Sequence, residues 1–380
     1  MEVIDEVIHD NCTGKNLIGG FILNKKIILV SVSVLCLVLM LAVVLMTGAC
    51  KAPEAKVVEP EAPEVIEVRG IHPFPYDHLL SWTYREIGDR INEMGQGRLI
   101  FTDLGGGEVA PAFEQLKLVM AGTADLIETA TAYAASDFYE ALPLDPGLAG
   151  PTGTEVREAG MIDALDRMAR EQIGVGFLAS NGFFNFNAYT TTPVTTLADF
   201  EGMKMRSVGT YDFLAKQIGI ASVIVSPGEV YTALETGIVE GVFWPGRGIV
   251  DYGWEPFLKY QVYPDFWRCS GMGTYVNAEW FDGLPEWARD IVTAAVLSVE
   301  RDGVAIAWEQ TAVETRQLRE KGIEAITIDE ASWWEIQQII YEQTNKALRD
   351  NAPANAEEII HYMDLFYPPD EVWYPPFDWR

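Results

Sequence analysis

Cysteine is scarce in this chain of 380 residues, which contains only four. Cys12, Cys36 and Cys50 lie near the N-terminus, and Cys269 stands alone in the rest of the chain. A disulfide framework in the body is therefore excluded. No basic or histidine-rich segment adjoins Cys269, so we expect it to be a small buried side chain rather than a reactive thiol.

Positive charge is also scarce. The chain has 27 lysines and arginines against 56 aspartates and glutamates, a net charge of -29. Such a charge excludes nucleic acid as a partner. It also repels an anionic ligand at long range, so a site for an acid needs its own concentrated positive charge. For that reason, an arginine in a pocket is informative about where an acid could bind.

Catalytic and metal-binding motifs are missing. His72, His78 and His361 are scattered, and none has a ligand partner at helical spacing. There is no nucleophile elbow or dinucleotide fingerprint, and Gly105-Gly106-Gly107 lacks the lysine and spacing of a phosphate-binding loop. We expect no catalytic residue, cofactor or metal. A secreted hydrolase that uses paired carboxylates remains an alternative in so acidic a chain.

The long apolar run Ile27–Met46 follows Lys25 and Lys26 and is long enough to cross a bilayer. It ends in Thr47-Gly48-Ala49-Cys50, which is similar to a bacterial lipoprotein cleavage site with Cys50 as the lipidated residue. Residues 1–49 are therefore interpreted as a lipoprotein signal or a membrane anchor. Residues 50–68, rich in proline and glutamate, are interpreted as a tether. Both readings place the body in the periplasm or on the outer face of the cytoplasmic membrane.

The body alternates between helical and strand patterns. Helices are predicted near residues 80–94 and 112–121, and strands near 98–101, 124–128, 175–179, 203–206, 221–225 and 241–244. This alternation predicts α/β lobes with largely parallel sheets. Helix-compatible sequence then continues from Pro285 to Gly322, roughly 55 Å at 1.5 Å per residue. We expect this helix to cross both lobes, with a possible kink at Asp302-Gly303.

Two linked runs resemble a known family. They are Asp199-Phe200-Glu201-Gly202-Met203-Lys204-Met205-Arg206 and Gly228-Glu229-Val230-Tyr231-Thr232-Ala233-Leu234-Glu235-Thr236-Gly237-Ile238-Val239-Glu240-Gly241. Together with motifs upstream and downstream, they resemble the solute-binding subunits of tripartite ATP-independent periplasmic (TRAP) transporters over roughly residues 68–345. The resemblance implies a two-lobe fold of the periplasmic-binding-protein type that closes around a small organic acid. It also implies a membrane permease as the partner.

The resemblance also suggests how the chain is divided. Residues 69–185 plus about 246–280 are assigned to lobe I, and residues 186–245 plus about 281–345 to lobe II and the long helix. Residues 346–380 form a C-terminal extension outside the resemblance. This extension either packs back onto the body or joins subunits in a homodimer.

Arg206 is the residue that the family uses to hold the carboxylate of the ligand, and a guanidinium suits that task. Without the resemblance, a surface ion pair would be the expected role. Trp244 and Phe243 either form a ligand wall or pack in the core. A branch of the family that binds 2-oxo or 2-hydroxy acids with a metal carries an acidic ligand where this chain has Phe243, so metal-assisted binding is not expected.

Phe184 or Asn185 occupies the place of a further arginine in many relatives. The segment is either part of an aromatic pocket for a monocarboxylate or a crossing between lobes whose amides satisfy the backbone. Glu128 and Tyr133 follow a strand in the segment that lines the cleft in the family, and Tyr231 is a further pocket candidate. Glu128 could equally cap a helix. The alternative within the binding class is the receptor of an ATP-driven importer, against which the two runs argue.

Overall fold

The computed structural model describes residues 65–145, 151–208, 211–269 and 271–366. The description below concerns the unit Pro63–Arg380. The predicted signal or anchor, Cys50 and most of the predicted tether lie outside the described residues. The predicted tether reaches too far along the chain. Strand β1 (Ile66–Ile71) begins before residue 68, where the tether was expected to end, and pairs with β2.

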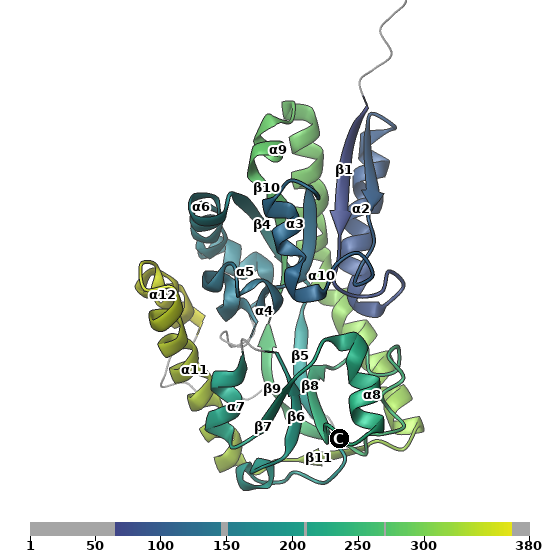
Figure 1. Ribbon diagram of the computed structural model, residues 1–380, viewed down its shortest axis with the longest axis vertical. Coiled ribbons are helices and arrows are strands. Elements are labelled where there is room, and N and C mark those ends of the chain that lie inside the picture. Colours follow the sequence, from purple (N-terminus) through teal and green to yellow (C-terminus); the bar gives the residue numbers. More distant parts are fainter. Residues whose placement is uncertain (1–64, 146–150, 209–210, 270, 367–380) are drawn as a thin grey trace, which may run out of the picture. The chain divides into compact units, whose positions relative to one another are not determined.

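The first sheet has the strand order β2-β1-β3-β10-β4. Its other strands are β2 (Leu99–Asp103), β3 (Leu126–Ala130), β4 (Val175–Asn181) and β10 (Met272–Asn277). Apolar residues of α2 (Trp82–Gly95) and of the first half of α10 (Glu286–Glu320) pack against one set of apolar side chains of this sheet. Those of α3 (Leu116–Met120), α6 (Met161–Ile173) and α12 (Ala356–Phe366) pack with another (Figure 1). This part of the chain is therefore a sheet between helical layers.

The second sheet has the strand order β11-β9-β5-β8-β6-β7. Its strands are β5 (Phe184–Thr190), β6 (Lys204–Ser207), β7 (Ala221–Ile224), β8 (Gly241–Pro245), β9 (Tyr260–Cys269) and β11 (Glu324–Thr327). Apolar residues of α7 (Asp212–Ile218), α8 (Val230–Glu235) and α11 (Glu330–Asn351) pack with it in one large core cluster. The predicted strands of both sheets are confirmed to within a few residues.

Both sheets are mixed, whereas largely parallel sheets were expected. Strands β4 and β5 follow one another across the two sheets, and so do β9 and β10. These two crossings run in opposite directions, so β10 is antiparallel to β4 in the first sheet and β5 is antiparallel to β9 in the second. Gly182, with φ 70°, lies at the first crossing, a conformation that glycine adopts without strain.

The crossing also shifts one expected boundary. Residues from about 246 to 280 were assigned to lobe I, but β9 lies in the second sheet between β5 and β11, and only β10 joins the first. The pairing of β9 with strands distant in sequence places it in the second sheet. The residue pattern of β9 itself does not indicate which sheet it joins. The lobe boundaries as a whole stay a prediction.

The predicted long helix is confirmed as α10, which follows the short helix α9 (Ala278–Gly283) and continues without interruption through Asp302 and Gly303. Val292 and Val296 pack in the core of the first sheet, and Leu318 packs in that of the second. A side chain at Gly303 would approach the indole of Trp82 to 3.3 Å, so the glycine lets α2 and α10 pack closely. The predicted helix at 112–121 is instead a 3₁₀ turn (Ala112–Glu114) followed by α3.

The shorter helices are α4 (Thr131–Ala134) and α5 (Gly153–Glu158). At the C-terminal end, α11 continues to Asn351, past the expected end of the lobes, and α12 buries Ile359, Ile360 and Met363 in the first-sheet core. The extension therefore packs back onto the body as far as Phe366. Residues 367–380 lie outside the described part, and the homodimer stays a prediction. Among the described helices, none combines the length and apolarity needed to cross a bilayer.

Candidate functional site

Arg206 is placed by the inner strand β6, which pairs in parallel with both β7 and β8. The side chain is only 4% exposed. Its Nε donates to the carbonyl of Val225 at 3.1 Å, and its Nη2 donates to the hydroxyl of Tyr133 at 3.4 Å. Its guanidinium carbon lies 5.2 Å from the centre of the Trp244 ring, a cation–π contact.

No ion pair joins Arg206 to an acid in the part of the chain that the structure describes. A buried guanidinium without a counter-ion is costly, since burial removes the water that would stabilise its charge. The contacts with a carbonyl, a phenol and an indole offset part of that cost and fix the orientation of the side chain. The arrangement suits an anion that enters and completes the pairing.

A cavity lies beside Arg206. The walls are mainly apolar and aromatic, and come from both sheets and the segments that follow their strands. The lining residues are Phe74, Leu80, Ala130, Tyr133, Asp145, Phe184, Phe186, Arg206, Val208, Tyr211, Trp244, Pro245, Cys269, Gly271 and Met272.

Asp145 is a second buried charge in this cavity, at 3% exposure, and follows a 3₁₀ turn (Tyr139–Leu144). The indole Nε1 of Trp267 and the thiol of Cys269 donate to its Oδ1 at 3.4 and 3.7 Å. Burial raises the pKa of Asp145 to about 6, and the hydrogen bonds from Tyr211, Trp267 and Cys269 oppose that rise. Cys269 itself is fully buried, as expected.

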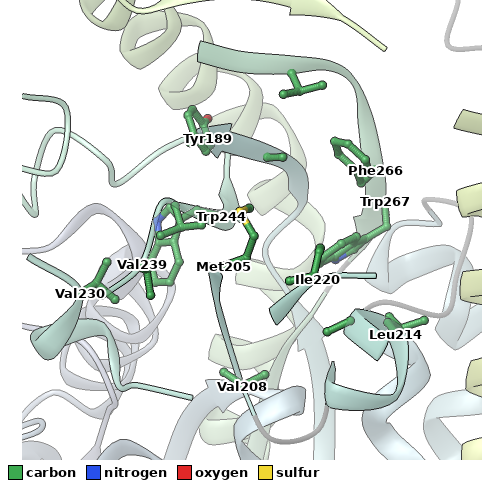
Figure 2. Close-up of a cluster of buried hydrophobic side chains, with 14 of the residues drawn as sticks. Tyr189, Met205, Val208, Leu214, Ile220, Val230, Val239, Trp244, Phe266 and Trp267 are labelled. Atoms are coloured by element: carbon green, nitrogen blue, oxygen red, sulfur yellow. The ribbon is translucent and has the colours of Figure 1, made fainter. Parts of the chain in front are cut away.

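Trp244, Tyr133 and Phe184, three of the ligand-binding candidates from the sequence, line the cavity. Trp244 is the penultimate residue of β8 and packs against Trp254 at 4.8 Å between ring centres. Figure 2 shows Trp244, Met205 and Trp267 within the buried cluster that supports this wall. Tyr133 lies in α4 directly after β3, and thereby connects the first sheet with Arg206.

Phe243 and Asn185 lie outside this cavity. Phe243 packs on Phe266 and Trp267, with ring centres 5.2 and 5.6 Å apart, and lines a second cavity beside α7, which Arg206 also lines. Alternation along β8 explains this, because neighbouring residues of a strand face opposite sides. Asn185 belongs to a buried polar network in which its amide donates to Asp265 at 3.3 Å and accepts from Thr311 at 3.4 Å.

Glu128 and Tyr231 also lie away from the cavity. Glu128 is fully buried within the first sheet, where it accepts from Thr274 and, at 3.2 Å, from Asn181. Burial raises its pKa to about 7, against the lowering effect of those hydrogen bonds. Tyr231 is 43% exposed and contacts Phe257 at 5.0 Å between ring centres. The described residues contain no group of three or more histidine, cysteine, aspartate or glutamate side chains arranged to hold a metal ion.

The chain belongs to the bacterial extracellular solute-binding protein family 7, whose model matches residues 83–350. Family 7 membership rests on this match of the sequence.

Two curated relatives illustrate the range of family 7. A monocarboxylate 2-oxoacid-binding periplasmic protein of Nostoc is 23% identical over 224 residues, which are 56% of this chain and 60% of the relative. A C4-dicarboxylate-binding periplasmic protein of Rhodobacter capsulatus is 27% identical over 183 residues, 47% of this chain and 54% of the relative. The matches thus span little more than half the length of these relatives.

Solved structures of related fold cover more of the chain. A solute receptor of Bordetella pertussis binding pyroglutamic acid has a TM-score of 0.66 at 18% identity, covering 79% of this chain and 99% of that structure. A TRAP periplasmic solute-binding protein of Desulfovibrio salexigens with bound orotic acid has a TM-score of 0.68 at 18% identity, covering 80% and 99%. At this identity the likeness shows the fold, and the two-lobe α/β prediction is confirmed.

The sequence reasoning missed several lining residues that the family 7 motifs do not contain, chiefly Asp145, Phe74, Phe186 and Tyr211. Asp145 could not be singled out among 56 acidic residues. The aromatic side chains follow no spacing that would separate a cavity wall from core packing. Only the tertiary contacts bring them to Arg206.

Proposed function

We propose that this chain is the extracytoplasmic receptor of a TRAP-type secondary transporter, which captures a small organic acid and delivers it to a membrane permease. The observation that carries the proposal is Arg206, a buried cation in an aromatic cavity, with no acidic partner in the described part of the chain. Charge interactions are strong in such a dry site. Family 7 membership and the acids bound by its relatives support the same function.

Capture would proceed by closure of the two lobes. Tyr133 follows a strand of the first sheet, whereas Arg206 and Trp244 lie on strands of the second. A ligand held by both sides favours the closed form by its difference in affinity for the closed and open forms. The closed form is then the shape that a permease can recognise. No bond needs to be broken, and we propose no catalytic residue.

The ligand that we propose is a monocarboxylate. Of the described residues that line the cavity, Arg206 alone carries a positive charge. A second carboxylate of a dicarboxylate would face apolar walls or Asp145, without a cation to compensate it. Phe184, which lines the cavity, adds an aromatic surface there and no charge.

We also propose that residues 1–49 act as a signal or anchor and that Cys50 is lipidated, with the residues that follow serving as a tether. The apolar run before Cys50 supports this part of the proposal. It places the receptor outside the cytoplasmic membrane, next to its permease.

The test is a thermal-shift screen of the full-length chain against mono- and dicarboxylates. We expect monocarboxylates to raise the melting temperature by several degrees. The Arg206→Gln variant should bind the best acid about 100-fold more weakly, because it loses a charge-assisted hydrogen-bonding partner. Arg98→Gln is the matched control, since Arg98 is exposed and contacts Trp287 at 4.3 Å outside the cavity.

The proposal fails if no organic acid stabilises the chain, or if Arg206→Gln binds as tightly as Arg98→Gln. Recovery of the acid unchanged after prolonged incubation distinguishes a receptor from a hydrolase. Turnover of the acid would overturn the receptor function.

A further inference from the structure

The cavity beside Arg206 contains two opposite charges that do not pair with each other. Arg206 and Asp145 both line it, and both are almost completely buried. Within the described residues, neither takes part in an ion pair. Each is held by neutral groups instead: Val225 and Tyr133 for the guanidinium, and Trp267 and Cys269 for the carboxylate.

Tyr133 lies within the electrostatic reach of both charges. Burial raises the pKa of its phenol; the charge of Arg206 lowers that pKa, and the charge of Asp145 raises it further. Both charges therefore act on the same part of the cavity. The site has a positive end and a negative end, joined by a wall that contains the Tyr133 hydroxyl.

This arrangement limits which acids the cavity can hold. The charges of an ionised Asp145 and of Arg206 cancel, so these two lining side chains contribute no net charge to the site. A plain monocarboxylate would give it a net negative charge, and burying an uncompensated charge is costly. A carboxylate that also carries a protonated nitrogen would leave the site neutral, with its negative end at Arg206 and its positive end at Asp145.

The surroundings of Asp145 suit a cation in other respects. Its partner Trp267 is stacked on Phe186 at 4.7 Å between ring centres, and Tyr211 lies 5.8 Å from Trp267. Phe186 and Tyr211 both line the cavity. Aromatic faces beside a carboxylate attract a positively charged nitrogen through their quadrupoles.

We propose that the natural ligand is a zwitterion, a small monocarboxylic acid with a protonated amine, and that Asp145 selects it by binding the nitrogen while Arg206 binds the carboxylate. This inference rests on the proposed receptor function and narrows its ligand class. Asp145 is thus a specificity residue that the sequence motifs do not contain.

The test uses pairs of acids that differ only in the nitrogen. Calorimetry of the full-length chain at pH 8 compares proline with cyclopentanecarboxylate, 2-aminobutanoate with butanoate, and phenylalanine with 3-phenylpropanoate. In the pair that binds best, we expect the amino acid to bind at least 10-fold more tightly than its partner. This comparison needs no variant, so it does not depend on how a substitution folds.

The Asp145→Asn variant keeps the shape of the side chain and removes its charge. In this variant we expect the ratio of the two affinities, amino acid over plain acid, to fall close to one. A purely structural role of Asp145 would instead weaken the binding of both acids of a pair equally. Binding of the amino acids should still be lost in Arg206→Gln.

Three results would overturn the inference. If the plain acids bind as tightly as their amino partners and need Arg206, Asp145 does not select and the receptor function stands. If Asp145→Asn keeps the full preference, the nitrogen is bound elsewhere. If neither series binds, the inference and the proposed function fail together.

Discussion

Among the described residues, three buried carboxyl groups have raised pKa values, yet only one of them lines the cavity. Burial raises the pKa of Asp145 to about 6 and those of Glu128 and Glu314 to about 7. A shifted pKa is thus no guide to the site in this protein, because burial alone produces it. The three groups differ in position, since Asp145 lines the cavity, Glu128 lies inside a sheet and Glu314 lies on the long helix.

Glu128 makes folding stability depend on pH. Its folded pKa of about 7 lies above the ordinary value of 4.5, so the folded chain retains a proton that the unfolded chain releases. Its favourable contribution is fully present below about pH 4.5 and is lost as the pH rises through 7. In Glu128→Gln, the difference in unfolding free energy between pH 5 and pH 8 should shrink by roughly 2 kcal/mol.

Denaturant unfolding at the two pH values measures this effect. Glu93→Gln is the control, because Glu93 is exposed on α2. Ligand affinity should be unchanged in Glu128→Gln, since the residue does not line the cavity. An unchanged pH dependence in that variant would show that Glu128 titrates normally in the folded protein.

At the scale of elements, helix α10 connects the two sheets through a few buried contacts. In the first part, Glu300 forms an ion pair with Arg157 at 2.7 Å. In the second part, the Glu314 carboxylate accepts from the backbone amides of Gly248 and, at 3.0 Å, Val250. These amides belong to the segment that follows Trp244 and Pro245, so the helix supports one wall of the cavity.

Removal of that support should destabilise the chain and weaken ligand binding. Glu314→Ala leaves two largely buried backbone amides without their acceptor, and we expect a loss of about 2 kcal/mol in unfolding free energy. Glu309→Ala makes the same change on an exposed face of α10 and should be nearly neutral. Chemical denaturation compares the two variants. Equal stability would mean that the loop after β8 holds its place without Glu314.

At the scale of the whole molecule, the net charge of -29 opposes compaction, since like charges repel over the surface. Acidic residues are about twice as frequent as basic ones, so basic partners are too few to pair with all of them. In the cavity, by contrast with the surface, the opposite charges of Arg206 and Asp145 cancel. A ligand without net charge would also avoid the long-range repulsion that the molecule exerts on anions.

The repulsion predicts a salt effect on stability. Raising the salt concentration from 10 mM to 0.3 M shortens the screening length from about 30 Å to well under 10 Å. We expect the melting temperature at pH 7.5 to rise by several degrees. The gain should be smaller at pH 5, closer to the isoelectric point of about 4.4. Calorimetric scans at both pH values measure it, and a lower melting temperature in high salt would show that attractive ion pairs dominate.

Prediction from sequence succeeded where a pattern is local. The strand before Arg206, the helix from Pro285 to Gly322 and the strand ending at Trp244 each have a period that is visible in the chain. Prediction failed where the question was which of two neighbouring side chains faces the cavity. Phe243 and Trp244 are neighbours, and the sequence does not say which of them faces the cavity. The same holds for Phe184 and Asn185.

The sequence by itself determined the alternating α/β elements, the long helix and the motif that contains Arg206, because helix and strand periods depend on neighbouring residues. Only the tertiary structure decided the mixed sheets, the transfer of β9 to the second sheet and the meeting of Asp145 with Arg206 in one cavity. These depend on pairings between residues far apart in the chain, for which a single sequence carries no local signal. The opposite charges in the cavity are the clearest case, since Asp145 and Arg206 acquire a joint role only when the fold buries them together.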